Sequence, residues 1–440
     1  MAVLSAGECS YSESGVSSHS KQDEVAMRGS EDEDKDGLCN IAHDHIPLDL
    51  TVEILTRLPA KSLKRFQCVS KEWLSTIRNQ AFIDSFSSMS QTRSRFLVAV
   101  RGNDENRVFL LSSSHKETKI PTTPTPGWFV NPIGYTCLHT TLEMTMSGLP
   151  VDLVHCSSVH GLFALLHPSY PGRFTICNPS TREMITLPDI EATSSGRREQ
   201  TYLFLGYDPV GKEHKALCST VLYGERCQQH WVLTLGRGKL SWRGIQGGKT
   251  LRYTVVTKGI CINGKVYYGG WITRGEEKKA RILRFDVRSE RLVCIARFWP
   301  CLTQGSLINY NGKLASVYPD PRRPLRIFHL LVLEEDLDKR RWIMDTICFH
   351  PLLPELSGGI QLNMLGTSKK GEIILGPLKL PPKHEPLYIF YYHERKGKDF
   401  IRRVEVEGFE EFGCNHTSDE QCVCQLLLSV DHIESLASLQ

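Results

Sequence analysis

One short stretch of the chain holds residue types that could bind phosphate, but it lacks part of the phosphate-binding motif. The stretch 244–250 ends in Gly-Gly-Lys-Thr, as a phosphate-binding loop does. The first glycine of that motif would fall at Arg243, and β-branched residues follow where a helix would have to begin so that its N-terminus could meet the phosphate. We therefore predict no phosphate site in this stretch.

A second candidate is a group of metal-ligand types near the carboxyl end, namely Cys414, His416, Cys422 and Cys424. Their spacing matches no standard zinc finger. Cys422 and Cys424 also alternate as residues on one face of a strand do. We expect ordinary buried or edge thiols and no metal ion.

Patterns typical of catalysis are missing. The chain has no Gly-x-Ser-x-Gly and no His-Glu-x-x-His motif, and no pair of carboxylates stands out as an acid and its base. We predict no catalytic residue and no cofactor. The tryptophans could form a recognition surface, but at strand positions they more often pack in the core, and this is what we expect of Trp231, Trp242, Trp271 and Trp342.

Composition indicates a folded, intracellular protein. The chain has 440 residues, of which 40% are hydrophobic and 23% charged, and no stretch reaches the length of a membrane span. The first residues are too short an apolar run for a secretory signal. The 15 cysteines are odd in number and scattered, so we expect reduced thiols and a location in the cytoplasm, the nucleus or both.

Charge is unevenly distributed along the chain. Residues 1–42 hold 3 basic and 9 acidic side chains, which leaves 50 basic and 40 acidic residues in the remainder. That excess of +10 is too diluted for the clustered Lys and Arg of a nucleic-acid-binding protein. Residues 1–42 are also rich in Ser and poor in apolar residues, so we predict a disordered acidic tail.

Beyond residue 94 the sequence consists of short alternating strands that repeat about every 50 residues. One series of glycine-containing turns has steps of 50, 53, 48 and 59 residues, at Gly161, Gly211, Gly264, Gly312 and Gly371. A second series of polar turns falls between them, near Pro179, Arg237, Arg288, Asp338 and Arg395. Two interleaved series predict two hairpins in each repeat.

Two turns of the first series are strong hairpin signals, because Asn263-Gly264 and Asn311-Gly312 can adopt the positive φ angles that a two-residue turn needs. Units of four antiparallel strands without helices between them are typical of a β-propeller. Five units fit between residues 152 and 408. Residues 95–113 could complete a sixth with the strand 421–430 and so close the ring. A β-sandwich is the alternative fold.

Residues 46–86 have a helical pattern instead. Leu50, Ile54, Leu55 and Leu58 are spaced as one face of a helix that Pro59 would end. Further along, Leu63, Phe66 and Val69 form a second apolar face, and Ser70 is a good N-cap for a third helix with Trp73 and Ile77. Three helices in about 40 residues make a marginal domain, so another domain or another protein must cover their apolar faces.

This helical segment resembles the F-box in the form common in plants. The resemblance covers residues 45–78 and rests on Ile46-Pro47-Leu48-Asp49-Leu50, Glu53-Ile54-Leu55, Arg57-Leu58-Pro59, Lys61-Ser62-Leu63, Arg65-Phe66, Cys68-Val69-Ser70-Lys71 and Trp73. The proline that usually follows the motif is absent at Asn79-Gln80-Ala81-Phe82, which affects only the exit from the third helix.

The remainder is similar to the plant F-box-associated domain, which is propeller-like. The matching phrases are Ile176-Cys177-Asn178-Pro179-Ser180-Thr181-Arg182, Leu205-Gly206-Tyr207-Asp208, Gly259-Ile260-Cys261-Ile262-Asn263-Gly264 and Asp431-His432-Ile433-Glu434-Ser435-Leu436. Kelch repeats carry a Gly-Gly doublet in each blade, and only Gly269-Gly270 fits that pattern.

These resemblances predict an α+β multidomain chain. It comprises a tail (1–42), a three-helix F-box (43–86), a linker (87–94) and an all-β domain (95–440), a propeller of about six blades. They imply the substrate-recognition subunit of a Skp-cullin-F-box ubiquitin ligase, with no catalysis in this chain. The adaptor-binding residues they imply are Pro47, Leu50, Ile54, Leu55, Leu58, Pro59, Phe66, Val69 and Trp73.

Two alternatives remain open at this point. A propeller hydrolase or sugar-modifying enzyme with a helical cap would show convergent His and carboxylates in its central channel. An adaptor-binding protein without ligase work would not associate with cullin. If the chain is a receptor, its target should contact inter-strand loops, for which the candidates are 318–326, 351–359 and 122–132, the last with Trp128 and Phe129.

Overall fold

The computed structural model describes residues 46–93, 95–101, 108–114, 136–139, 141–146, 158–166, 172–190, 198–222, 227–236, 238–245, 250–274, 277–297, 306–335, 340–382, 384–395, 398–407, 409 and 425–439. The chain divides into Met1–Pro47, of which Ile46 and Pro47 are described and exposed, and the compact unit Leu48–Gln440. Among the described helices, none has the length and apolar character needed to cross a membrane.

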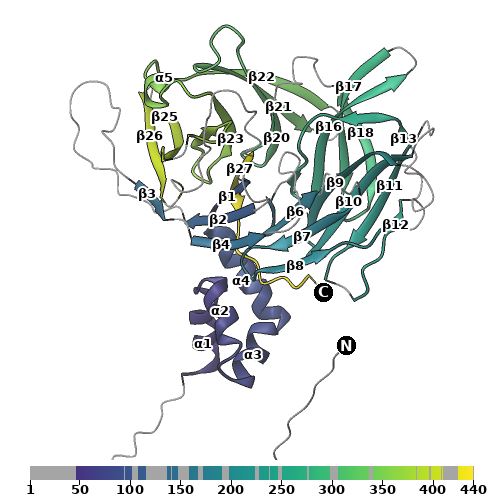
Figure 1. The fold of residues 1–440 in the computed structure, drawn as a ribbon, viewed down its shortest axis with the longest axis vertical. Coiled ribbons are helices and arrows are strands. Elements are labelled where there is room, and N and C mark those ends of the chain that lie inside the picture. Colours follow the sequence, from purple (N-terminus) through teal and green to yellow (C-terminus); the bar gives the residue numbers. More distant parts are fainter. Residues whose placement is uncertain are drawn as a thin grey trace, which may run out of the picture. The chain divides into compact units, whose positions relative to one another are not determined.

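The compact unit begins with four helices, one more than the sequence predicted (Figure 1). They are α1 (Leu48–Thr56), α2 (Ala60–Phe66), α3 (Lys71–Arg78) and α4 (Gln80–Thr92). Helix α1 ends at Thr56, ahead of Pro59, and Pro59 is the N-cap of α2. The expected linker 87–94 is helical as far as Thr92, because Phe82, Phe86 and Ser90 face the helical core at a spacing of four residues.

The helices enclose a small apolar core. Six buried residues form it, namely Leu55, Ala60, Leu63, Ile77, Phe82 and Phe86. As predicted, Ser70 caps α3, with its Oγ accepting a hydrogen bond from the backbone N of Trp73 at 3.1 Å. Arg93, at the end of α4, donates to the carbonyl oxygens of Thr56 and Arg57 and so satisfies the end of α1.

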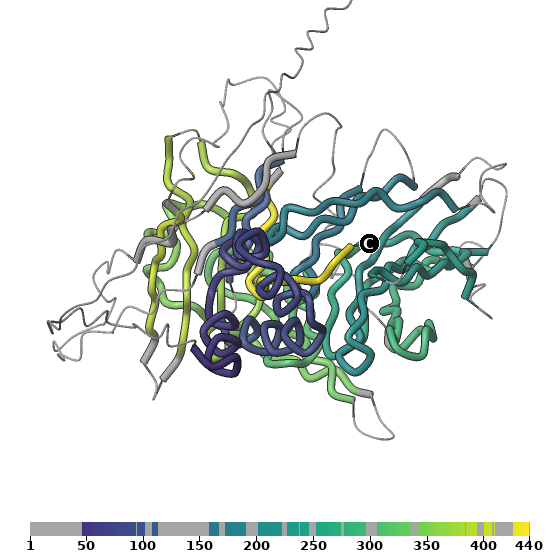
Figure 2. Tube along the Cα trace, turned by 90° about the horizontal axis from the view of Figure 1, so that it is seen from below, coloured from purple at the N-terminus to yellow at the C-terminus, as the bar shows by residue number. Residues whose placement is uncertain are grey.

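Six sheets follow, antiparallel except for one pair of strands in the last, and they are the blades of a β-propeller, as predicted (Figures 1 and 2). We number the blades by the chain order of their strands. Blade 1 contains β27 (Gln425–His432), β1 (Arg95–Arg101), β2 (Val108–Ser114) and β4 (Thr141–Met146), and blade 2 contains β5 (Ser158–Val159), β6 (Leu162–Leu166), β7 (Phe174–Asn178) and β8 (Glu183–Thr186).

The other four blades are built in the same way. Blade 3 has β9 (Arg198–Asp208), β10 (Glu213–Leu222), β11 (Cys227–Thr234), β12 (Arg243–Gly244) and β13 (Thr250–Leu251); blade 4 has β14 (Tyr253–Val255), β15 (Ile260–Ile262), β16 (Lys265–Arg274), β17 (Glu277–Asp286) and β18 (Arg291–Arg297). Blade 5 has β19 (Ser306–Tyr310), β20 (Lys313–Pro319), β21 (Ile327–Glu335) and β22 (Arg340–Cys348); blade 6 has β23 (Leu362–Thr367), β24 (Ile373–Pro377), β25 (Leu387–Arg395), β26 (Lys398–Glu407) and β3 (Thr136–His139). A short helix, α5 (Leu353–Leu356), connects the last two blades.

The predicted turns lie where the repeat requires them. Each glycine of the first series precedes the second strand of a blade in sheet order, and Pro179, Arg288 and Arg395 of the second series lie at or just after the end of the third. Arg237 and Asp338 lie outside the described residues. Asn263 and Gly264 have φ angles of 48° and 76°, and Asn311 and Gly312 have 52° and 80°. Both pairs therefore form the predicted two-residue hairpin turns.

The ring closes by joining the two ends of the propeller. Strand β27 pairs antiparallel with β1, for example Leu97 with Ser429, so the last strand is the innermost strand of the first blade. The sequence predicted this closure. It did not predict β3, which lies in blade 6 as a parallel partner of β26.

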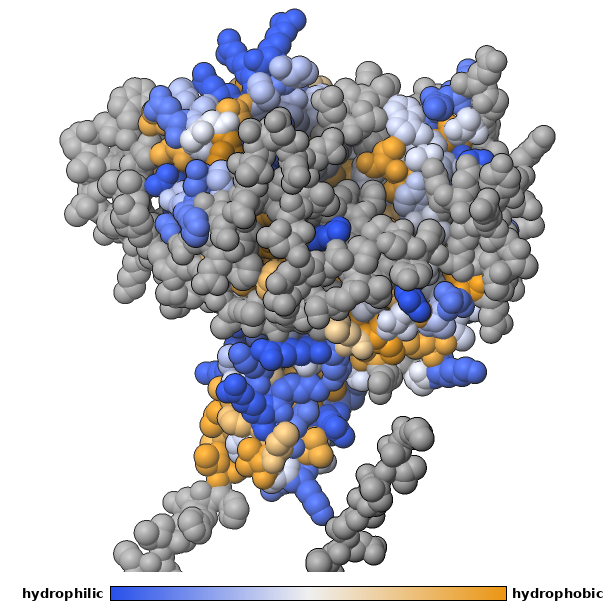
Figure 3. Space-filling model, in the orientation of Figure 1, coloured by the Kyte–Doolittle hydropathy of each residue, from blue (hydrophilic) through white to orange (hydrophobic). Residues whose placement is uncertain are grey.

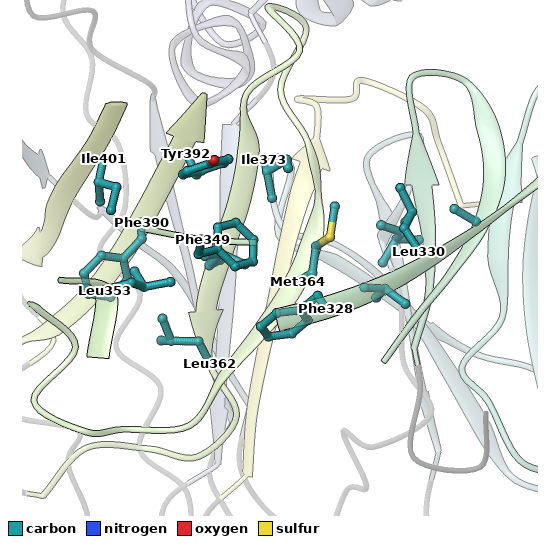
Figure 4. Close-up of a cluster of buried hydrophobic side chains, with 14 residues drawn as sticks. Phe328, Leu330, Phe349, Leu353, Leu362, Met364, Ile373, Phe390, Tyr392 and Ile401 are labelled. Atoms are coloured by element: carbon teal, nitrogen blue, oxygen red, sulfur yellow. The ribbon is translucent and has the colours of Figure 1, made fainter. Parts of the chain in front are cut away.

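Apolar side chains from neighbouring blades interlock between the sheets. In the cluster between blades 5 and 6, Phe349 is 1% exposed and contacts Phe328 and Tyr392 edge to face, with ring centroids 5.4 and 4.7 Å apart (Figure 4). Such aromatic packing is a large part of what holds adjacent sheets together.

Replacing Phe349 by Ala should lower the free energy of unfolding by about 3 to 5 kcal/mol, because it leaves a cavity between two blades. Urea denaturation followed by fluorescence measures the change. Ile343→Ala, at a side chain 39% exposed on β22, is the matched control and should change stability by about 0.5 kcal/mol or less. Equal midpoints for wild type and Phe349→Ala would contradict this packing.

Candidate adaptor-binding surface and the propeller channel

Helix α1 has two apolar faces where the sequence predicted one. Leu55 is 2% exposed and faces the helical core, whereas Leu50 and Ile54 are 47% and 51% exposed. Leu55 is therefore not part of the accessible surface, and it supports the exposed face from beneath. A helix with one buried stripe normally shows polar residues on the other side, so the exposed leucine and isoleucine are unusual.

The other predicted adaptor-binding residues differ in their exposure. Val69 is 65% exposed and Pro59 is exposed, while Leu58, Phe66 and Trp73 are half-buried against the helical core. The rings of Phe66 and Trp73 pack edge to face with centroids 4.9 Å apart. Pro47, the remaining predicted residue, is exposed in the preceding unit.

Leu48, which is 60% exposed, also belongs to this surface although we did not predict it. It begins α1 at a helical spacing from Val52 and Leu55, which face the helical core, so the spacing did not mark it as exposed. We define the F-box patch as Leu48, Leu50, Ile54, Pro59 and Val69. Figure 3 shows apolar surface gathered over the helical region. An exposed apolar patch on an otherwise well-packed domain marks an interaction site.

Helix α4 contacts the propeller through polar side chains. Gln91 Nε2 lies 3.0 Å from Nε2 of His160, whose ring stacks on Tyr207 with centroids 3.6 Å apart. Burial lowers the pKa of His160 to about 4, so the ring is neutral near pH 7 and can share a hydrogen bond with the amide. Nearby, Lys212 forms an ion pair with Asp84 of α4.

A cavity of about 990 Å³ runs between the inner strands of the blades. Its described lining contains one histidine, His160, and one carboxylate, Asp431. His160 bonds Gln91, and the side chain of Asp431, an exposed residue, accepts a hydrogen bond from Asn309. The convergent histidines and carboxylates that would favour an enzyme are not seen in this described lining.

Two of the three predicted target-binding loops are described. The loop 318–326 follows β20, and its last residue accepts a hydrogen bond at its carbonyl from the backbone N of Phe349, just before the loop 351–359, at 2.8 Å. Strands alternate in direction, so these loops lie at the strand ends opposite the turns of Gly161 and Gly211. The third loop, 122–132, with Trp128 and Phe129, lies outside the described residues.

The weaker chemical candidates have structural roles where they are described. The four tryptophans pack against hydrophobic clusters, as predicted, and Trp242 also donates to the carbonyl of Pro188 at 2.7 Å. Thr250, at the end of the phosphate-loop-like stretch, begins strand β13 and not a helix.

The described cysteines are free thiols, and the described residues contain no group able to hold a metal ion. Cys414, His416, Cys422 and Cys424 lie outside that part of the chain, so the prediction for them stays a prediction.

Comparison with known families matches the two regions separately. Residues 44–84 match the F-box domain, and residues 95–433 match the F-box associated beta propeller domain. The order of these two matches, an F-box domain and then a β-propeller domain, agrees with the helical unit and the propeller of this structure. The chain belongs to the F-box proteins that carry an F-box associated propeller domain.

Several of its relatives are proteins of Arabidopsis thaliana. F-box protein At1g30790 is 40% identical over 90% of this chain and 98% of its own length, and F-box protein DOR is 32% identical over 89% and 93%. Among solved structures, a fucose-specific lectin from Aleuria aurantia is 8% identical over 59% of this chain and 80% of its own, with a TM-score of 0.32, which supports no argument.

Because α1 has one buried and one exposed apolar face, two adjacent residues should affect stability by very different amounts. Leu55→Ala should lower the free energy of unfolding of the helical unit by about 2 to 5 kcal/mol, because it empties part of the core. Ile54→Ala should change it by about 0.5 kcal/mol or less, because that side chain is half exposed to solvent. Hydrogen exchange of α1 to α4 measures both, and equal effects would refute the assignment of the two faces.

Proposed function

We propose that this chain is the substrate-recognition subunit of a Skp-cullin-F-box ubiquitin ligase. The F-box patch binds the Skp-type adaptor, and the propeller binds a target protein. The chain supplies proximity between target and ligase, while ubiquitin transfer is carried out by the RING subunit and its conjugating enzyme. This work would take place in the cytoplasm or nucleus.

The observation that carries the proposal is the exposure of apolar side chains on a unit that already has a complete core. Leu50, Ile54 and Val69 are 47%, 51% and 65% exposed, yet the residues beneath them are fully packed. Such side chains are not needed to fold the helices. Burial against a partner would remove them from water, which stabilises a complex.

The two alternative functions, a propeller enzyme and an adaptor-binding protein without ligase work, make different demands on the structure and on the partners. An enzyme would need acid and base groups that converge on a substrate, and the propeller channel offers His160 and Asp431, each bonded to a neighbouring amide. An adaptor-binding protein without ligase work would use the same F-box patch, so only association with cullin separates it from a ligase receptor.

The proposal predicts that Leu50→Ala combined with Ile54→Ala abolishes co-purification with a Skp-type adaptor. Each truncated anchor should weaken the complex by about 2 kcal/mol, or roughly 30-fold in Kd. Isothermal titration with the purified adaptor measures the loss. We avoid Leu58 in this variant because it packs against the helical core.

The matched control replaces two exposed apolar residues of the propeller, Ile343 and Met344, by Ala. This variant removes the same kind of surface and should bind the adaptor like wild type. Undiminished binding by the Leu50→Ala, Ile54→Ala variant, folded by circular dichroism, would remove the basis of the proposed function.

We further propose that the target contacts at least one of the loops 318–326, 351–359 and 122–132. The first of these is preorganised, since Asp320 Oδ1 accepts from the backbone N of Arg322 and Arg323 at 2.8 and 3.1 Å. A loop held in one conformation loses less entropy on binding. Both arginines are exposed, so the loop presents positive charge to a partner.

Exchanging each loop for a short Gly/Ser linker tests this placement. Target capture should fall in at least one exchange variant while adaptor binding stays unchanged, because the F-box patch lies on other elements. Captured proteins are quantified by mass spectrometry after affinity purification, in versions with the F-box patch disabled so that targets are not degraded, and adaptor binding is measured separately in versions with the patch intact. Full capture by all three variants would refute the placement.

A further inference from the structure

The last residues of the chain form a buried segment without regular secondary structure. After β27, residues Ile433–Leu439 belong to no helix or strand, yet Ile433, Ser435 and Leu439 are only 6%, 7% and 2% exposed. Ordering an irregular segment costs backbone entropy that no ladder of hydrogen bonds offsets. Its partners must therefore come from elsewhere in the chain.

Side chains of the propeller hold this C-terminal segment. Asn178 Nδ2 donates to the carbonyl oxygens of Ser435 and Ala437 at 3.0 and 3.2 Å. The backbone N of Ser435 donates to Ser180 Oγ at 3.2 Å, and Leu439 enters the apolar cluster of blades 2 and 3. Asn178 and Ser180 are themselves buried, so these bonds are shielded from competing water.

The segment passes so close to blade 2 that one turn must be a glycine. A Cβ atom at Gly161 would lie 2.4 Å from Cβ of Ser435 and 2.9 Å from the carbonyl oxygen of Ile433. Its φ of 87° is also one that other residues rarely adopt. This turn of the repeat is thus shaped to receive the segment.

The same segment reaches the F-box. Leu436 packs against the helical core that includes Phe82 and Phe86 of α4. Ser435 is therefore hydrogen-bonded to the propeller, and Leu436, the next residue, packs at the edge of the F-box core. The C-terminal segment is a direct apolar link between the two domains.

Two ion pairs also join the F-box helices to the propeller, but unlike the contact of Leu436 they depend on salt concentration. Lys64 of α2 pairs with Glu183 of β8 at 2.6 Å, and Lys212 pairs with Asp84 of α4. Exposed ion pairs of this kind contribute little and are screened by salt. The apolar contact of Leu436 is not screened, so it should dominate the attachment at physiological ionic strength.

We propose that the segment Ile433–Leu439 fixes the orientation of the F-box on the propeller, with Leu436 and Asn178 as positioning residues. This rests on the proposed function, because a fixed F-box holds a target on the propeller at a set position relative to the adaptor. Among the described residues, the other contacts named between the two domains are the chain between α4 and β1, the hydrogen bond of Gln91 with His160 and the two ion pairs.

The test measures the distance between the domains directly. Spin labels on the exposed native thiols Cys68, in the F-box, and Cys348, on β22, report a distance distribution, with every other cysteine that reacts replaced by serine. Wild type should give one narrow distribution, unchanged by high salt. Leu436→Ser and Asn178→Ala should each broaden it, and Leu378→Ser, at an exposed leucine, should not.

Adaptor affinity is measured on the same samples and separates this inference from the proposed function. We expect it to change by about twofold or less in both variants, because the F-box patch is not altered. Should Leu436→Ser unfold the F-box, Asn178→Ala decides, since it leaves Leu436 in place. A broad wild-type distribution, or a narrow one in Asn178→Ala and in any folded Leu436→Ser, would overturn the inference whether or not the adaptor binds.

Discussion

The pairing of β27 with β1 is the interaction on which the rest of this structure depends. It hides the edges of the first and last strands and brings together residues more than 300 positions apart, such as Leu97 and Ser429. Because β1 follows directly from α4, the same pairing returns the carboxyl end of the chain to the F-box. Ring closure and the attachment of the F-box are therefore consequences of one strand register.

A second consequence concerns how a domain of about 40 residues can be stable. Its apolar faces are too large for it to bury alone, and the structure divides them between two partners. Leu436 from the C-terminal segment covers one edge of the helical core, while Leu50 and Ile54 stay exposed. The F-box is thus completed from within the chain on one side and left open to another protein on the other.

The blades could be predicted because glycine-containing turns recur at a regular spacing. The conformation of such a turn depends on its own residues and not on distant parts of the chain. Strand β3 had no such signal, because its four residues pair with β26 from far along the sequence. Helical spacing placed Leu55 on the same face as Ile54, although neighbours in a helix point about 100° apart. The C-terminal segment has neither periodicity nor turn residues, so only the folded chain reveals that Leu436 reaches the F-box.

The central claim is that this chain connects a target to a cullin ligase through its F-box patch. Light scattering of the purified chain mixed with a Skp-type adaptor and cullin tests this most directly. The account predicts a single species containing one copy of each protein, which loses this chain but keeps adaptor bound to cullin when Leu50 and Ile54 are replaced. A chain that elutes alone, or that binds the adaptor but excludes cullin, would contradict it.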